Sequence, residues 1–296
     1  MTTQSCFICG NPRLDHNGGA YQRCGYCGHE TLIESQNQGY IINDPLTIED
    51  VETRTKLDTF KDKVMRQFFP NPPPDAVWVD VGSGSGKYLY QNRALYRDSY
   101  GLEITPSAVE FSRKVLGLNI LEDAKNLPRS INLITAWHSL EHFPAAELQR
   151  VLVLLSESCN VNSRFVISIP NVASFQCKLF GESYAFTDIP SHLHQFSPKS
   201  LDTLMSRYGF KKTSNIISWP YNIFGYVQGL LNFATGTHNY VYFRIKRKNC
   251  KGSFWQDFLN LALVPIFGPL GILLSGLDAL NPNLQGVLTV CYKKDH

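Results

Sequence analysis

The feature that most constrains this chain is an apolar run, residues 77–81, that leads directly into Gly82, Gly84 and Gly86. The run has the β-branched composition of a buried strand, and a helical pattern begins at Lys87. Glycines at such a bend allow a tight turn and a close approach of the backbone to a ligand. The first turn of the helix behind the bend offers unpaired N–H groups. Strand, turn and helix together predict a ligand-binding turn at the edge of a sheet.

Short β-branched or apolar runs alternate with helical patterns along most of the chain. The expected strands are residues 77–81, 100–103, 119–121, 131–137, 165–169, 210–217 and 287–292. Strands that alternate with helices predict an α/β fold with a parallel, doubly wound sheet. The last two strands are separated by a long insert, residues 219–284.

With 296 residues, the chain is long enough for one large domain and a small appendage. Its 43% hydrophobic and 18% charged residues provide a sizeable core and exclude general disorder. The net charge of +3 excludes a strongly basic nucleic-acid coat protein. We expect a cysteine-rich domain at 1–40, a helix with a proline-rich connector at 41–74, and the α/β domain at 75–296. The helix is expected to begin near Thr47 and to end before Pro70.

Three classes of ligand compete for the glycine-rich turn. A phosphate-binding P-loop requires four residues between two glycines, but only three separate Gly82 from Gly86. It also requires Ser or Thr after its lysine, whereas Tyr88 follows Lys87. A dinucleotide fingerprint matches imperfectly, because the third glycine falls at 86 and a lysine follows it.

The pattern acid-x-Gly-x-Gly-x-Gly, from Asp80 to Gly86, resembles the first motif of class I S-adenosylmethionine (SAM)-dependent methyltransferases. Later segments resemble further motifs of that family in order and spacing. They are Gly101-Leu102-Glu103-Ile104, Leu121-Glu122-Asp123-Ala124, Leu140-Glu141-His142, the strand 165–169 with its Pro170-Asn171 end, and His194-Gln195-Phe196-Ser197 with Gly209-Phe210. The resemblance implies a Rossmann-like doubly wound sheet of seven strands, SAM as the cofactor and methyl transfer as the activity.

The same resemblance implies which residues contact the cofactor. The carboxylate of Glu103, at the end of the second strand, is expected to accept the ribose hydroxyls, and Asp123 is expected to accept the adenine amino group. The full expected set is Asp80, Gly82, Ser83, Gly84, Gly86, Glu103, Asp123, Ala124, Trp137 and His138.

Four histidines lie in the two loops that flank the predicted site. His138 and His142 follow the fourth strand, and His192 and His194 lie in a loop after the fifth strand that could close over the acceptor. A general base helps methyl transfer to a hydroxyl, and histidine titrates near pH 7. A lone histidine is more often structural, but four around one site favour catalysis. We expect the base to be His142 or His192.

The first 27 residues contain two Cys-x-x-Cys pairs, Cys6 with Cys9 and Cys24 with Cys27, separated by fourteen residues. Four thiolates at this spacing favour a structural zinc ion over a redox dithiol. Such a short segment has too few apolar residues for a core, so the metal should supply its folding energy. A ribbon of this form ahead of the methyltransferase fold is similar to enzymes of sugar and polysaccharide tailoring, where the ribbon shapes or covers the acceptor side.

The insert contains a charge-free apolar stretch, residues 258–277, long enough to cross a bilayer. Its prolines, Pro265 and Pro269, argue against one straight helix. Five cations lie just upstream, between residues 244 and 251. This combination favours an interfacial helical hairpin on an anionic membrane face, through residues 221–280. A spanning segment, a buried lid, an acceptor pocket and a subunit interface remain alternatives.

Together these features predict a SAM-dependent methyltransferase that acts on a hydroxyl of a sugar, a polysaccharide precursor or a lipid-linked small molecule. Alternatives are a quinone-precursor O-methyltransferase, an RNA methyltransferase and a SAM-binding scaffold without catalysis. Nucleic acid is not the expected partner, because residues 1–34 hold only Arg13 and Arg23 as basic residues. The N-terminus lacks the pattern of a secretory signal, so we expect a cytoplasmic protein, peripheral on the inner face of a membrane. The sequence does not predict the oligomeric state.

Overall fold

A computed structural model describes residues 5–12, 14–16, 20–33, 46–246 and 253–295. Its centre is a seven-stranded sheet in the order β10-β11-β8-β7-β4-β5-β6. The strands are β4 (Val77–Val81), β5 (Asp98–Leu102), β6 (Asn119–Leu121), β7 (Ile131–Trp137), β8 (Cys159–Pro170), β10 (Phe210–Ile216) and β11 (Val287–Lys294). Each expected strand is present, and the largest difference is that β8 begins earlier.

The sheet is mixed, whereas the sequence predicted a parallel one. β11 pairs antiparallel with both β8 and β10. The reason lies in the insert, which leaves the carboxyl end of β10 and returns at the same end. Val287, the first residue of β11, is paired with Pro170, the last residue of β8. With no crossover back to the amino end of the sheet, β11 must run in the opposite direction.

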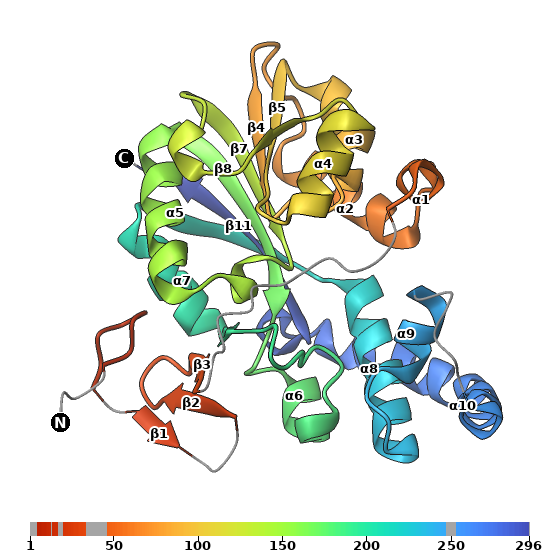
Figure 1. The fold of residues 1–296 in the computed structure, drawn as a ribbon. Helices are drawn as coiled ribbons and strands as arrows, with labels where there is room; N and C mark the ends of the chain where they lie inside the picture. Colours follow the sequence, from red (N-terminus) through yellow and green to blue (C-terminus); the bar gives the residue numbers. More distant parts are fainter. Residues whose placement is uncertain (1–4, 13, 17–19, 34–45, 247–252, 296) are drawn as a thin grey trace.

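Helices cover both faces of the sheet (Figure 1). One face carries α2 (Lys56–Phe68), α3 (Lys87–Asn92) and α4 (Pro106–Lys114); the other carries α5 (Ala145–Ser158) and α7 (Pro198–Arg207). Alternate residues of β4 enter different cores, because successive side chains of a strand point to opposite faces. Val77, Val79 and Val81 join the cluster that contains residues of α5 and α7, and Trp78 joins the cluster that contains residues of α2 and α3.

The helix expected to begin near Thr47 is interrupted. Thr47 caps a short helix, α1 (Ile48–Glu52), and Thr55 opens α2 with a capping box to Asp58. A second capping residue so close to the first restarts the helix rather than continuing it. α2 ends at Phe68, as the following prolines predicted.

The cysteine-rich segment forms a small second sheet with a strand from the α/β domain. Its strands are β1 (Leu14–His16), β2 (Tyr21–Cys24) and β3 (Glu30–Leu32), and β3 pairs with β9 (His194–Gln195). The Ser197 hydroxyl donates to the Cys27 carbonyl at 2.6 Å, and Arg207 donates to the Phe7 carbonyl at 2.6 Å. The ribbon is therefore joined to the α/β domain by strand pairing and side-chain hydrogen bonds.

The insert forms three helices at the edge of the molecule, α8 (Trp219–Thr235), α9 (Tyr240–Lys246) and α10 (Phe254–Asp278). The prolines do not divide the apolar stretch into separate helices, since α10 is one continuous helix of 25 residues with Pro265 and Pro269 inside it. Packing against α8 supports it: a Cβ on Gly271 would lie 2.7 Å from a methyl group of Val227. Among the described residues, α10 is the helix long and apolar enough to cross a membrane.

A further short helix, α6 (Phe175–Phe180), lies between the ribbon and the insert (Figure 1). Short 3₁₀ turns complete the fold: Arg93–Leu95, Ala124–Asn126, Leu140–His142, Gly181–Ser183 and Pro282–Leu284. The arrowhead of β8 points to the side where the ribbon, α6 and the insert lie (Figure 1). The carboxyl ends of the parallel strands therefore face the accessory segments.

Candidate active site

The glycine-rich turn needs its glycines for two physical reasons. Gly82, Gly84 and Gly86 have φ values of +67°, +56° and +72°, a region that other residues rarely adopt. A Cβ on Gly82 would lie 2.4 Å from the Cβ of Ser139, so the turn also packs tightly under the loop after β7. The Ser139 hydroxyl holds that loop in place by donating to the Val81 carbonyl at 2.8 Å.

Glu103 lies at the end of β5 and is tied to the glycine turn. Its Oε2 accepts a hydrogen bond from the Gly84 amide at 2.8 Å, and its Oε1 accepts from the amides of Ile104 and Thr105 at 2.9 and 2.8 Å. A carboxylate has about four lone-pair positions, so it retains acceptor capacity for a diol. The structure thus places Glu103 beside the turn, as the cofactor-binding prediction requires.

Asp80 lies deeper, inside the sheet. Its Oδ1 accepts a hydrogen bond from the Thr135 hydroxyl, which in turn accepts from the indole of Trp78 at 2.9 Å. Burial raises the pKa of Asp80 to about 6, even though the Thr135 hydrogen bond lowers it. Asp80 therefore supports the turn from below and links β4 to β7.

Asp123 and Ala124 follow β6, as expected for the adenine side. Asp123 is partly exposed, and its Oδ1 accepts from the Lys125 amide and from Arg150, both at 2.9 Å. These hydrogen bonds lower the pKa of Asp123. Ala124 is buried. Ser83, also in the predicted set, has a buried hydroxyl that makes no hydrogen bond to any described residue.

Trp137 ends β7 and packs edge-on against Tyr88, with ring centroids 5.7 Å apart. Its indole N–H is buried and finds no acceptor among the described residues. The sequence did not predict that α2 would reach this place, yet the Lys61 ammonium lies 5.2 Å from the Trp137 ring and 5.1 Å from the Tyr88 ring. Lys87, to which the sequence assigned no role, forms an ion pair with Asp58 of α2 at 3.0 Å.

The structure brings three of the four candidate histidines together. The rings of His142 and His192 lie 4.7 Å apart. Glu141 directly precedes His142 in the chain, and one of its carboxylate oxygens lies 3.5 Å from Nδ1 of His138. His138 has φ +52°, an unfavourable conformation held by a hydrogen bond from its amide to the Ser168 carbonyl at 2.8 Å. His194 lies apart from this group, under the ribbon, where its ring contacts Phe7 and His29.

Glu141 is the member of this group that sequence reasoning missed. Its side chain is 1% exposed, although glutamate is usually found at the surface. Burial raises the pKa of Glu141, but the contact with His138 and the nearby His142 lower it to about 2. Burial lowers the pKa of His192 to about 4, so this imidazole is neutral near pH 7. The one signal in the sequence that could have identified Glu141 was its place directly beside His142, a candidate catalytic residue.

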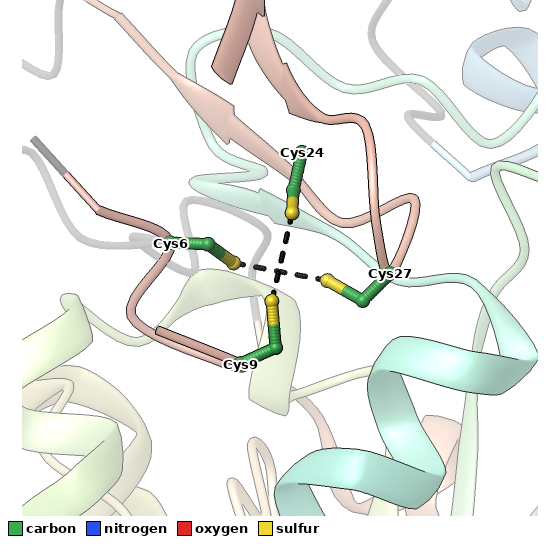
Figure 2. Close-up of side chains that lie close together, drawn as sticks. All are labelled: Cys6, Cys9, Cys24 and Cys27. Carbon is green, nitrogen blue, oxygen red and sulfur yellow. Dashed lines mark hydrogen bonds between the residues drawn. The ribbon is translucent and has the colours of Figure 1, made fainter. Parts of the chain in front are cut away.

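The four ribbon thiols converge from two turns (Figure 2). The sulfur atoms of Cys6 and Cys27 lie 3.7 Å apart, and those of Cys9 and Cys24 lie 3.6 Å apart. Four sulfurs at about 2.3 Å from one zinc ion would stand about 3.8 Å apart in a tetrahedron. The residues present therefore fit a tetrahedral ion, and the cluster is compatible with a zinc ribbon.

Comparison with known proteins agrees with this geometry. Residues 53–215 match the family model described as a methyltransferase domain. A structure of a putative sarcosine dimethylglycine methyltransferase from Galdieria sulphuraria is similar, with 12% identity, a TM-score of 0.52 and coverage of 85% of this chain and 94% of that chain. A SAM-dependent methyltransferase from Archaeoglobus fulgidus has 18% identity, a TM-score of 0.46 and coverage of 80% and 94%. A search of curated proteins finds no match.

The matched region spans more than half of the chain and contains strands β4 to β8 of the central sheet, together with nearly all of β10. The chain therefore belongs to the methyltransferase domain family. It is a class I SAM-dependent methyltransferase, and the predicted fold class is confirmed.

Proposed function

We propose that this enzyme methylates a hydroxyl group of a sugar, a polysaccharide precursor or a lipid-linked small molecule. The observation that carries the proposal is the position of His138, His142 and His192, which lie together where the loops after β7 and β8 meet. SAM supplies a methyl group on a positively charged sulfur. Residues of the glycine turn, with Glu103 and Asp123, would hold its amino-acid, ribose and adenine parts.

Methyl transfer of this kind is a direct displacement, in which the attacking oxygen, the methyl carbon and the sulfur lie in line. The protein contributes positioning and exclusion of water. A hydroxyl is a weak nucleophile, so loss of its proton must accompany or precede attack. The imidazoles gathered beside Glu141 support a hydroxyl as the acceptor group, because histidine side chains can accept a proton near pH 7.

The insert supplies an aromatic wall to the same place. The ring of Tyr221, from α8, lies 4.7 Å from the ring of His138, and Phe186 lies 6.2 Å from it on the other loop. Aromatic faces pack well against sugar rings and against planar acceptors. This wall also favours a second candidate, O-methylation of a hydroxylated aromatic quinone precursor.

Access to a lipid-linked acceptor is supported by the surface of α10. Large apolar side chains are exposed along the helix, which is about 37 Å long at 1.5 Å per residue. Those at least 57% exposed are Phe254, Trp255, Phe258, Leu261, Ile266, Ile272, Leu273 and Leu277. An apolar face of this size is more than a soluble monomer usually exposes.

We propose that this face lies on an anionic lipid bilayer. The sequence places Lys246, Arg247, Lys248 and Lys251 just before α10, and cations there favour an anionic surface. Arg247, Lys248 and Lys251 lie outside the described residues, and only the backbone of Lys246 is described. Arg244 forms an ion pair with Asp257 at 3.0 Å. We expect the protein to co-sediment with phosphatidylglycerol vesicles and Leu261→Asp/Leu273→Asp to stay in the supernatant.

The matched control is Val161→Asp, which changes an exposed valine near the amino end of β8. Equal sedimentation of both variants would contradict the membrane proposal. A second copy of the chain is the competing occupant, and a dimer that dissociates in the double variant without vesicles would favour it.

We also propose that the ribbon cysteines bind one zinc ion as a structural centre. The sulfur spacing supports this, and so does the scarcity of buried apolar side chains in the described part of the ribbon. The Tyr21 hydroxyl donates to the His192 carbonyl at 2.9 Å, so a folded ribbon also positions the acceptor loop. Metal analysis of the purified protein should give one zinc ion that is lost when Cys24 is replaced by serine.

The methylation proposal is tested by incubating the enzyme with methyl-labelled SAM and three pools of acceptors: soluble sugars, polyprenyl-linked sugars and hydroxylated aromatic extracts. We expect label in a sugar or lipid-linked product, with release of S-adenosylhomocysteine. Label confined to the aromatic pool would favour the quinone-precursor candidate, and label in added RNA would contradict both. Failure to bind SAM in calorimetry would contradict the proposal as a whole.

A further inference from the structure

The buried carboxylate of Glu141 stands out because it has no hydrogen-bond donor. Neither oxygen accepts a hydrogen bond from any residue in the described part of the chain. The nearest polar contact is Nδ1 of His138, at 3.5 Å from Oε1. An ionised carboxylate without donors is costly to bury, and it becomes stable when it coordinates a cation.

Two histidines direct ligand atoms at the same point. One oxygen of Glu141 and one ring nitrogen each of His142 and His192 all lie within 4.8 Å of one another. Ligands at about 2.0–2.2 Å from one ion stand roughly 3–4 Å apart, so small side-chain rotations would close the cluster. Two imidazoles and one carboxylate are a frequent ligand set for divalent first-row metals, and they leave coordination positions open.

Hydrogen bonds around the cluster orient these side chains. Nδ1 of His142 donates to the Ser191 carbonyl at 2.9 Å, which fixes the orientation of the ring and places the imidazole lone pair on Nε2. Nδ1 of His192 is buried and has no hydrogen-bond partner among the described residues.

The loop that carries His192 is fixed on both sides. Its amide donates to the Asp188 carbonyl at 2.7 Å, and the amide of Leu193 donates to the Glu141 carbonyl at 2.9 Å. Fixed backbones and a fixed tautomer are features of a metal site that is built before the ion arrives.

We propose that Glu141, His142 and His192 bind one divalent first-row transition-metal ion, whose open positions take an oxygen of the methyl acceptor. This inference rests on the proposed function and adds to it. The ion would lower the pKa of the bound hydroxyl, so that the O–H bond breaks and the proton leaves to water. The oxygen then forms a bond to the methyl carbon as the carbon–sulfur bond breaks, and the electron pair of that bond stays on sulfur. In this arrangement His142 and His192 act as ligands, and no free base is required.

The test is a cobalt titration of the full-length protein. A mild chelator first removes labile metal while zinc remains in the ribbon, and Co²⁺ is then added. We expect one Co²⁺ per chain, with the visible absorption of a nitrogen and oxygen site. The sulfur-to-cobalt charge-transfer band that exchange into the ribbon would produce should be absent.

Glu141→Gln should weaken Co²⁺ binding at least tenfold. His142→Gln should also weaken Co²⁺ binding at least tenfold. Because His142 is only half-buried, this second variant keeps the test valid if Glu141→Gln fails to fold. His238→Gln is the matched control, because it removes an imidazole from the exposed surface. Unchanged Co²⁺ affinity in Glu141→Gln, or no binding to the parent protein, would overturn the metal site.

SAM affinity is measured on the same samples, so that the two proposals fail separately. Normal SAM binding without a cobalt site would overturn only the metal inference. Loss of SAM binding in the parent protein would instead contradict the methyltransferase proposal. If cobalt binds but turnover is unchanged after chelation, the catalytic role of the ion is overturned.

Discussion

The two sides of the candidate site are built in different ways. The donor side, from Asp80 to Trp137, is made of short turns directly after β4, β5, β6 and β7. The acceptor side is assembled from the ribbon, the loop after β8 and the insert, which are distant in sequence and meet at the carboxyl end of the sheet (Figure 1). The comparison teaches that the predicted cofactor site is built from local segments, whereas the proposed acceptor site depends on long-range packing.

If the two sides are independent, a substitution that unfolds the ribbon should abolish methylation of the acceptor and leave SAM binding intact. Cys24→Ser should lose zinc, because three thiolates do not complete the tetrahedron, and the ribbon has little core of its own. We expect methyl transfer to fall below detection while SAM affinity stays within a few-fold. Hydrogen exchange of residues 21–32 and calorimetry with SAM measure the two effects. Cys177→Ser, a thiol outside the ribbon, should change neither.

The complementary test is Gly82→Ala, which disrupts the glycine-rich turn on the donor side. Its Cβ would overlap that of Ser139, and the left-handed backbone adds strain, so we expect a loss of about 4 kcal/mol in unfolding free energy. SAM binding should be lost with it. Gly117→Ala is the control, since Gly117 has φ +64° but no neighbour within 4 Å. It should cost only about 1–2 kcal/mol and leave SAM affinity unchanged. Equal effects would show that the packing at Gly82 is unimportant.

Asp80, on the donor side, should make the stability of the fold depend on pH. Its pKa is about 6 in the folded protein, against 3.8 for an unperturbed aspartate side chain, so the folded state binds more protons between these values. Stability should therefore fall as pH rises from about 4 to 6, by about 3 kcal/mol. Asp80→Asn should remove this slope, which urea unfolding at a series of pH values measures. Asp123→Asn should remove a slope of opposite sign, because the pKa of Asp123 is lowered.

The smallest expected effect is at Glu103. Glu103→Gln keeps the shape but removes the charge that the ribose hydroxyls would meet. SAM affinity should fall by about 1–3 kcal/mol, or roughly 5- to 150-fold, in calorimetry. Glu110→Gln, which changes an exposed acid on α4, should leave the affinity as it is. An unaltered affinity in the Glu103 variant would remove this residue from the predicted cofactor site.

The sequence predicted the strands of the sheet and the glycine-rich turn because their signals are local. Each strand was marked by a short β-branched or apolar run, and the glycines of the turn were marked by their spacing. The direction of β11 was not predicted, because it depends on where the insert begins and ends. The continuity of α10 was not predicted either, since a local rule about proline ignores the support from α8.

On the acceptor side, the sequence named the histidines but could not group them. His192 and His194 are two residues apart, yet one faces His142 and the other lies under the ribbon. The pairing of β3 with β9, only two residues long, separates them. Glu141 was missed because its burial depends on a loop that arrives much later in the chain. Burial of a polar side chain is a property of the assembled fold.

The insert leaves the sheet after β10 and rejoins it at β11 on the same rim. The helices of such a segment can be lengthened, shortened or exchanged while the strands stay in place, since β8, β10 and β11 pair with one another and not with α8, α9 or α10. Under the proposed roles of the insert, the acceptor and the membrane contact can change while the sheet is preserved. A chimera that carries a different segment between Ile216 and Val287 should keep its frame and change what it modifies.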